Sequence, residues 1–155
     1  MKITSTAFEE GGAIPSEYTC DGDRLLSPAL QVEDVPEGAR FLALIADDPD
    51  VPKALMPEGV FTHWVLFNIP ADTEEIPEGE TVGTPGANGR GDKHYTGPCP
   101  PTDHEPSEHR YFFKLYALDS MLDIPEGSTR ETVENAMEGH VIETAELIGR
   151  YKRTV

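Results

Sequence analysis

Two histidines and a pair of carboxylates are the side chains in this sequence whose types and spacing suit chemistry. Asp48 and Asp50 stand in a proline-rich turn, His63 begins an apolar run, and His109 opens a later alternating segment. A histidine titrates near neutral pH, and a neighbouring carboxylate favours its cationic form. An imidazolium of this kind can donate hydrogen bonds to phosphate or carboxylate oxygens. The sequence therefore predicts a site for a small anion.

A loop rich in glycine and proline, Gly97-Pro-Cys-Pro-Pro101, is the second feature that suits such a site. Gly97 has no Cβ, so we expect it to let a ligand approach backbone N–H groups closely. The prolines at 98, 100 and 101 stiffen the loop without adding donors. Together these residues predict a rigid wall for the anion site.

The same residues leave other interpretations open. Asp48 with His63 or His109 would serve an enzyme as an acid–base pair, with Cys99 as nucleophile. However, the prolines on both sides of Cys99 supply no helix N-terminus to activate it. Two histidines and two acids are also a ligand set for a metal, without a recognised spacing. The preferred interpretation is a binding protein without catalytic residues, metal or cofactor. Three further histidines are assigned no role in the site: His94, His104 and His140.

Length and charge exclude several classes of partner. The 155 residues predict one domain, 1–155, with a single good core. There are 29 acidic residues against 12 basic ones, a formal net charge of -17, and no basic stripe. This charge repels nucleic acid and the anionic face of a membrane, so we expect neither partner. No segment resembles a signal peptide or a membrane span, and we expect a cytoplasmic protein.

The acidic residues are spread along the whole chain rather than gathered in a tail. This distribution indicates a solvated shell suited to high salt, because at low salt the self-repulsion destabilises the compact state. An ordinary acidic protein is the alternative. For a salt-adapted, halophilic protein, the melting temperature is expected to rise between dilute buffer and molar potassium chloride. A melting temperature that does not rise would contradict this.

The two cysteines, Cys20 and Cys99, form neither a disulfide framework nor a zinc-binding spacing. We interpret them as small buried thiols. The sequence leaves a bridge between them open.

Most of the predicted elements are strands. Alternation or apolar runs predict strands over 3–8, 40–46, 62–69 and 109–118, and 70–101 is expected to be a long functional loop. Ser128 begins a capping-box pattern that predicts a helix through Glu138. In the 109–118 strand, His109 and Tyr111 share a face, while Arg110 points away and is expected to support the turn by pairing with Asp48 or Asp50. We also expect at least one cis proline in that turn.

Two stretches resemble the signatures of the phosphatidylethanolamine-binding proteins, also called Raf kinase inhibitor proteins, in their bacterial and archaeal branch. The first is Asp48-Pro-Asp-Val-Pro52 with His63-Trp64, and the second is Gly97–Pro101 with His109-Arg-Tyr111. The resemblance implies a mainly β sandwich of Greek-key type with one or two short helices, one near the C-terminus. It also implies a closing strand over 145–151 and leaves a homodimer open.

The resemblance further implies a pocket for phosphate-type head groups, with the 97–101 loop as its rim. The ligand would be phosphate, a phosphorylated metabolite or a phosphopeptide, and the protein a regulator or inhibitor of a partner. Two departures bear on this. No tryptophan follows Ser27-Pro-Ala-Leu30, and the 102–108 insert is long and acidic. The residues that match signature positions, and are expected to bind ligand, are Asp48, Asp50, Pro52, His63, Gly97, Cys99, Pro100, Pro101, His109 and Tyr111.

Overall fold

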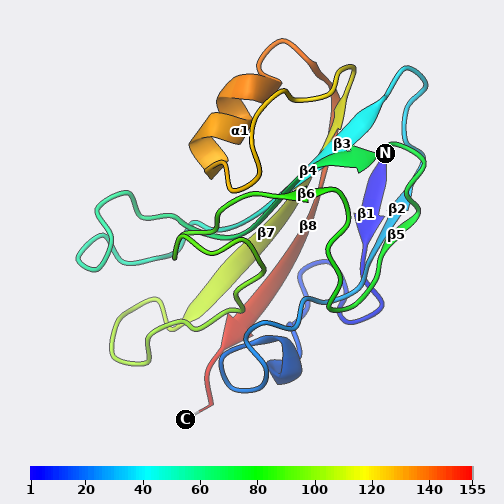
Figure 1. The fold of residues 1–155 in the computed structure, drawn as a ribbon. Helices are drawn as coiled ribbons and strands as arrows, with labels where there is room; N and C mark the ends of the chain where they lie inside the picture. The colour runs from blue at the N-terminus through cyan, green and yellow to red at the C-terminus, as the bar shows by residue number, and fades with distance from the viewer. Residues whose placement is uncertain (155) are drawn as a thin grey trace.

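Two antiparallel sheets form the protein, as the computed structural model of residues 1–154 shows (Figure 1). The smaller sheet has the order β1-β2-β5, with β1 at Lys2–Thr4, β2 at Leu30–Glu33 and β5 at Glu75–Ile76. The larger has the order β6-β4-β3-β7-β8. Its strands are β6 at Thr84–Pro85, β4 at Phe61–Pro70, β3 at Phe41–Asp48, β7 at Glu108–Leu118 and β8 at Val141–Lys152.

The larger sheet has the predicted Greek-key connection. Three strands of this sheet, β3, β4 and β6, follow one another along the chain and in space, and β7 then returns to pair with β3. This is the arrangement in which a fourth strand lies beside the first. It places the end of β3 next to the start of β4 on one side and the start of β7 on the other. Side chains from three strands therefore meet at one end of the sheet.

The central strands β3 and β4 are apolar almost throughout because both of their faces are buried. One face packs against the smaller sheet, where Leu44, Trp64 and Leu66 join the main hydrophobic core. The other face, including Ile45 and Val65, packs in a second cluster with residues of the helix α1. These two layers hold the ends of β3 and β4 rigidly.

Helix α1 spans Arg130–Met137 and covers the outer face of the larger sheet (Figure 1). The predicted helix is confirmed, but it begins later than expected. Thr129, not Ser128, is the N-cap, and its hydroxyl accepts the N–H of Thr132. Ser128 instead donates its hydroxyl to the carbonyl of Pro125, at 2.6 Å. A short 3-10 helix, Ser16–Tyr18, precedes the first cysteine.

The other predicted elements differ from the structure at their ends. The first strand stops at Thr4, because Ser5 turns its hydroxyl to the carbonyl of Ala29 and to the N–H of Ala7. The closing strand is longer than 145–151, since its residues pair with β7 along almost its whole length. The predicted loop over 70–101 begins with Pro70, the last residue of β4, and the strands within the rest of it are the two-residue β5 and β6. No helix in residues 1–154 has the length and apolar character to cross a membrane.

The prediction of a cis proline in the acidic turn was wrong. In residues 1–154 the cis peptide bond is Glu105-Pro106, in the 102–108 insert, and the bonds before Pro49 and Pro52 are trans. The turn is closed instead by a side chain. The Asp50 N–H donates to Asp48 Oδ1 at 2.8 Å, which reverses the chain without a cis bond.

Candidate anion-binding site

A pocket of about 310 Å³ opens where β3 ends and where β4 and β7 begin. Loops around residues 24, 90 and 96–101 complete its wall. Seven of the ten predicted ligand-binding residues line it: Asp48, His63, Gly97, Cys99, Pro100, Pro101 and His109. Three do not: Asp50, Pro52 and Tyr111. The remaining lining residues, which were not predicted, are Arg24, Val51, Phe61, Arg90 and Thr96.

Asp48 and His109 form a buried pair in the pocket wall. The distance from His109 Nδ1 to Asp48 Oδ2 is 2.6 Å, and the two residues are only 1% and 3% exposed. Burial by itself lowers the pKa of His109, but the hydrogen bond and negative charge of Asp48 outweigh it and leave the pKa above its ordinary value. The pair therefore favours an imidazolium beside a carboxylate.

Both ring nitrogens of His109 already have protein partners. Nδ1 faces Asp48, and Nε2 lies 3.0 Å from the carbonyl oxygen of Pro106. A carbonyl only accepts, so Nε2 carries a proton. The insert of 102–108 therefore closes over this histidine. In this arrangement His109 contributes charge and shape to the pocket, with no N–H left for a ligand.

His63 differs from His109 because one of its nitrogens has no partner. Its Nδ1 donates to the Thr96 carbonyl at 2.7 Å, while Nε2 is buried without a hydrogen bond. Burial lowers the pKa of His63, so the neutral ring is favoured. In the neutral ring, protonation of Nδ1 leaves Nε2 as an acceptor.

Tyr111 supports the two histidines from beneath the pocket. Its ring packs edge-on against His63, with centroids 5.2 Å apart, and stacks near His109 at 6.5 Å. Burial and the charge of Asp48 raise the pKa of the Tyr111 hydroxyl, so it stays protonated. The prediction that Tyr111 shares a face with His109 is confirmed, since both are buried on alternate positions of β7.

Asp50 and Arg110 brace the turn from outside the pocket. The guanidinium binds the carboxylate with two hydrogen bonds, of 2.9 and 2.8 Å, and the Arg110 backbone N–H donates to it as well. Hydrogen bonds from Arg110 hold the pKa of Asp50 below its usual range. Arg110 therefore pairs with Asp50, one of the two acids that the sequence offered as its partner.

Gly97 fits against protein backbone rather than against open space. A Cβ at this position would clash with the carbonyl oxygen of Tyr18, and the Gly97 N–H donates to the Arg24 carbonyl at 2.7 Å. Glycine is therefore required so that the loop before Cys99 can lie along the loop that carries Arg24. Its N–H is not free for a ligand.

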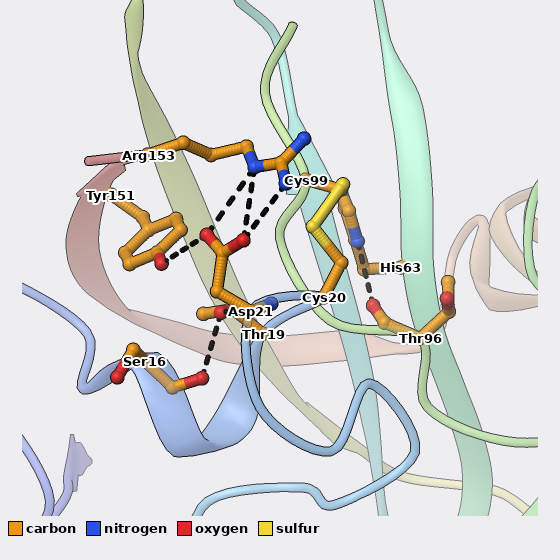
Figure 2. The surroundings of a disulfide bond; sticks show 9 residues. All are labelled: Ser16, Thr19, Cys20, Asp21, His63, Thr96, Cys99, Tyr151 and Arg153. Carbon is orange, nitrogen blue, oxygen red and sulfur yellow. Dashed lines mark hydrogen bonds and ion pairs between the residues drawn. A yellow bond between two sulfur atoms is a disulfide. The ribbon is translucent and has the colours of Figure 1, made fainter. Parts of the chain in front are cut away.

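A disulfide joins these same two loops, between Cys20 and Cys99 (Figure 2). The interpretation of both cysteines as buried thiols was wrong, and Cys99 has no thiol to act as a nucleophile. Their Cα atoms lie 5.4 Å apart because the loops run side by side, with Cys20 N–H donating to the Pro98 carbonyl. Cys99 is exposed at the pocket rim, and Cys20 is half-buried.

The loop with Cys20 is also fixed to the C-terminal end of the chain. Figure 2 shows Asp21 held between Tyr151 and Arg153. The Tyr151 hydroxyl donates to its carboxylate at 2.6 Å, and the guanidinium binds both carboxylate oxygens. On the other side of the disulfide, the view shows His63 and its partner Thr96. The two loops of the rim are therefore held by hydrogen bonds to His63 in the pocket and to Tyr151 in β8.

Arg24 and Arg90 are the two charged residues of the pocket lining that the sequence did not predict. Arg24 lies in an irregular loop, and its Nε is buried with no hydrogen bond. Arg90 is exposed, with the Asp92 carboxylate 4.0 Å from its Nε. Neither stands in a motif or a periodic segment. The one available signal was their scarcity, since the whole chain has only 12 lysines and arginines.

The remaining histidines lie outside the pocket lining. His104 and His140 each lie 2.9 Å from an aspartate, Asp103 and Asp119, at the surface. His94 contacts the carbonyl of its neighbour Tyr95. Within residues 1–154, no three histidine, cysteine, aspartate or glutamate side chains are grouped so as to hold a metal ion.

Comparison with known proteins identifies relatives over the full chain. The family model for phosphatidylethanolamine-binding protein matches residues 4–152. A UPF0098 protein of Methanothermobacter thermautotrophicus is 47% identical, and the match covers 99% of each chain. The crystal structure of a putative phosphatidylethanolamine-binding protein homologue from Chlamydia trachomatis is 41% identical, with a TM-score of 0.91 over 98% of this chain and 97% of that one. E. coli YbcL gives a TM-score of 0.86 at 27% identity, over 99% and 98% of the two chains.

Proposed function

Because this chain belongs to the phosphatidylethanolamine-binding protein family, we propose that it is a non-enzymatic protein whose pocket binds a small phosphate-type anion. The ligand is phosphate itself or the phosphoryl group of a metabolite or peptide. Through such a ligand the protein would act as a regulator or inhibitor of a partner.

Arg24 is the observation that carries this proposal. In residues 1–154 its guanidinium has neither a hydrogen bond nor an ion pair, although the chain has 29 acidic residues to offer. Its Nε is buried in the pocket wall. A buried donor on a cation costs free energy unless an acceptor satisfies it. An anion in the pocket supplies that acceptor, and an arginine fork fits phosphate oxygens well.

The size and charge of the pocket agree with a small ligand. Its volume of about 310 Å³ is at the lower end of the range for ligand sites. Arg24 and Arg90 bring positive charge to this pocket on a chain with a net charge of -17, while Asp48 balances the imidazolium of His109. The surrounding field repels anions in general, so entry requires favourable contacts within the pocket.

An NMR titration of the imidazoles tests the proposal. We expect saturable shifts at His63 and His109 when phosphate, and then phosphoethanolamine, is added in molar potassium chloride. Phosphoethanolamine is added below its second pKa of about 6, where its phosphoryl group keeps an O–H. The variant Arg24→Gln is expected to weaken this binding at least about tenfold, because a charge-assisted bond is lost. Arg40→Gln, a change of the same kind at an exposed residue outside the pocket, is the control and should bind normally. Unmoved imidazoles at saturating phosphate would refute the proposal.

A further inference from the structure

The buried wall of the pocket offers hydrogen-bond acceptors as well as a cation. In the described chain, three buried side-chain nitrogen or oxygen atoms have no hydrogen-bond partner: Arg24 Nε, His63 Nε2 and the hydroxyl of Tyr111. The first two belong to residues that line the pocket. Arg24 Nε can only donate, whereas the polarity of His63 Nε2 depends on where the ring carries its proton.

The Thr96 carbonyl determines which ring nitrogen of His63 carries the proton. A carbonyl oxygen cannot donate, so the 2.7 Å contact requires the proton on Nδ1. Nε2 then presents a lone pair to the pocket. Burial, which lowers the pKa of His63, further favours this neutral ring. Asp48 adds a second acceptor to the same wall, because a carboxylate has only lone pairs to offer.

A ligand that satisfies the unpaired atoms of this wall must accept a hydrogen bond from Arg24 Nε and donate one to His63 Nε2. Sulfate at neutral pH has only acceptor oxygens, so it would meet the lone pair of Nε2 and the carboxylate of Asp48 without a proton between them. Inorganic phosphate keeps at least one O–H at neutral pH, both as dihydrogen phosphate and as hydrogen phosphate. That O–H can donate to Nε2 while another oxygen accepts from Arg24.

We propose that the pocket selects oxyanions that retain an O–H group, and that His63 is the residue that sets this selectivity. The ligand class is hydrogen phosphate and singly protonated phosphoryl groups, with sulfate and other fully deprotonated oxyanions rejected. The inference rests on the proposed anion-binding function and adds the rule by which that site distinguishes anions. A site built around a hydrogen bond discriminates strongly, since the wrong ligand leaves a buried polar group unpaired.

Calorimetric titration with inorganic phosphate and with sulfate tests the rule. Both are added at pH 7, at one ionic strength set with potassium chloride. The dissociation constant for phosphate is expected to be at least about tenfold lower than that for sulfate. Equal constants would overturn the selectivity rule and leave the anion pocket standing. Absence of binding by both anions would overturn the rule together with the proposed function.

Two variants separate the roles of His63 and Arg24 in the pocket wall. In His63→Gln the amide can turn either its N–H or its carbonyl to the ligand, so sulfate is expected to bind nearly as well as phosphate. His140→Gln, at an exposed histidine away from the pocket, should keep the preference of the natural protein. Arg24→Gln is expected to weaken both anions by a similar factor and leave their ratio unchanged. A preference for phosphate that persists in His63→Gln would overturn the assignment to His63.

The nitrogen signals of His63 provide a readout that needs no variant. When phosphate binds, the ¹⁵N resonance of Nε2 is expected to move while Nε2 stays unprotonated, because it accepts a hydrogen bond. Sulfate should leave it in place. A phosphate complex in which Nε2 carries the proton would contradict the proposed polarity, whatever the affinities.

Discussion

Removal of the disulfide, by Cys20→Ser together with Cys99→Ser, is expected to lower the free energy of unfolding by about 4 kcal/mol. The bridge spans a sequence separation of 79 residues, and a cross-link over a long segment restricts the unfolded chain strongly. Serine is tolerated in the folded state because Cys99 is exposed and Cys20 half-buried. Urea denaturation of both proteins measures the difference.

The reduced natural protein is the control for this experiment. With a dithiol reductant present, its unfolding free energy should fall to that of the double-serine variant, which the reductant should not change. The same reduction is expected to weaken phosphate binding, because the loops that carry Arg24 and Cys99 lose their covalent link. A loss of stability below about 1 kcal/mol would show that the hydrogen bonds from Gly97 and Cys20 hold the loops without the bridge.

Asp48→Asn is expected to be the most disruptive single change in the site, costing about 3 kcal/mol near pH 6. The amide has nearly the shape of the carboxylate but no charge, so the buried imidazolium of His109 is left uncompensated. Asp50→Asn is the matched control. It breaks a pair with the exposed Arg110, and surface pairs contribute about 1 kcal/mol or less. Equal losses in the two variants would contradict the account of the Asp48–His109 pair.

The stability that the Asp48–His109 pair contributes depends on pH. The folded protein raises the pKa of His109, so the stability from the pair is fully present below the unfolded value of about 6.5. It is lost as pH rises through the folded pKa. The gap between the natural protein and Asp48→Asn should therefore narrow above neutral pH. His63 has the opposite effect on stability, because its pKa is lowered in the folded protein. Below about pH 6.5 the unfolded chain binds a proton at His63 more readily than the folded protein does, so stability falls as pH falls.

The strands that carry the site residues could be predicted from the sequence. Alternation along 109–118 correctly placed His109 and Tyr111 on one face, which the structure buries, and Arg110 on the other. The apolar runs before Asp48 and around His63 correctly predicted two strands, and the structure buries both faces of each. These predictions succeed because burial of one face gives an alternation with a period of two, and burial of both faces gives a continuous apolar run.

Contacts between irregular loops could not be predicted in this way. Arg24 reaches the pocket because its carbonyl binds Gly97, and the disulfide forms because Cys20 binds Pro98. No local pattern encodes either contact, since the partners lie far apart in the sequence. The acidic turn differs because its closing contact is local: the Asp50 N–H donates to the Asp48 side chain, and the bonds before Pro49 and Pro52 are trans.

A crystal structure of the protein grown in potassium phosphate at pH 7 would show whether the pocket holds an anion. We expect one phosphate in the pocket, with an oxygen within hydrogen-bond distance of Arg24 Nε and another within such distance of His63 Nε2. The Asp48–His109 pair should remain as it is. A pocket filled only by water at saturating phosphate, or phosphate bound solely elsewhere on the surface, would contradict the claim that this site exists to hold an anion.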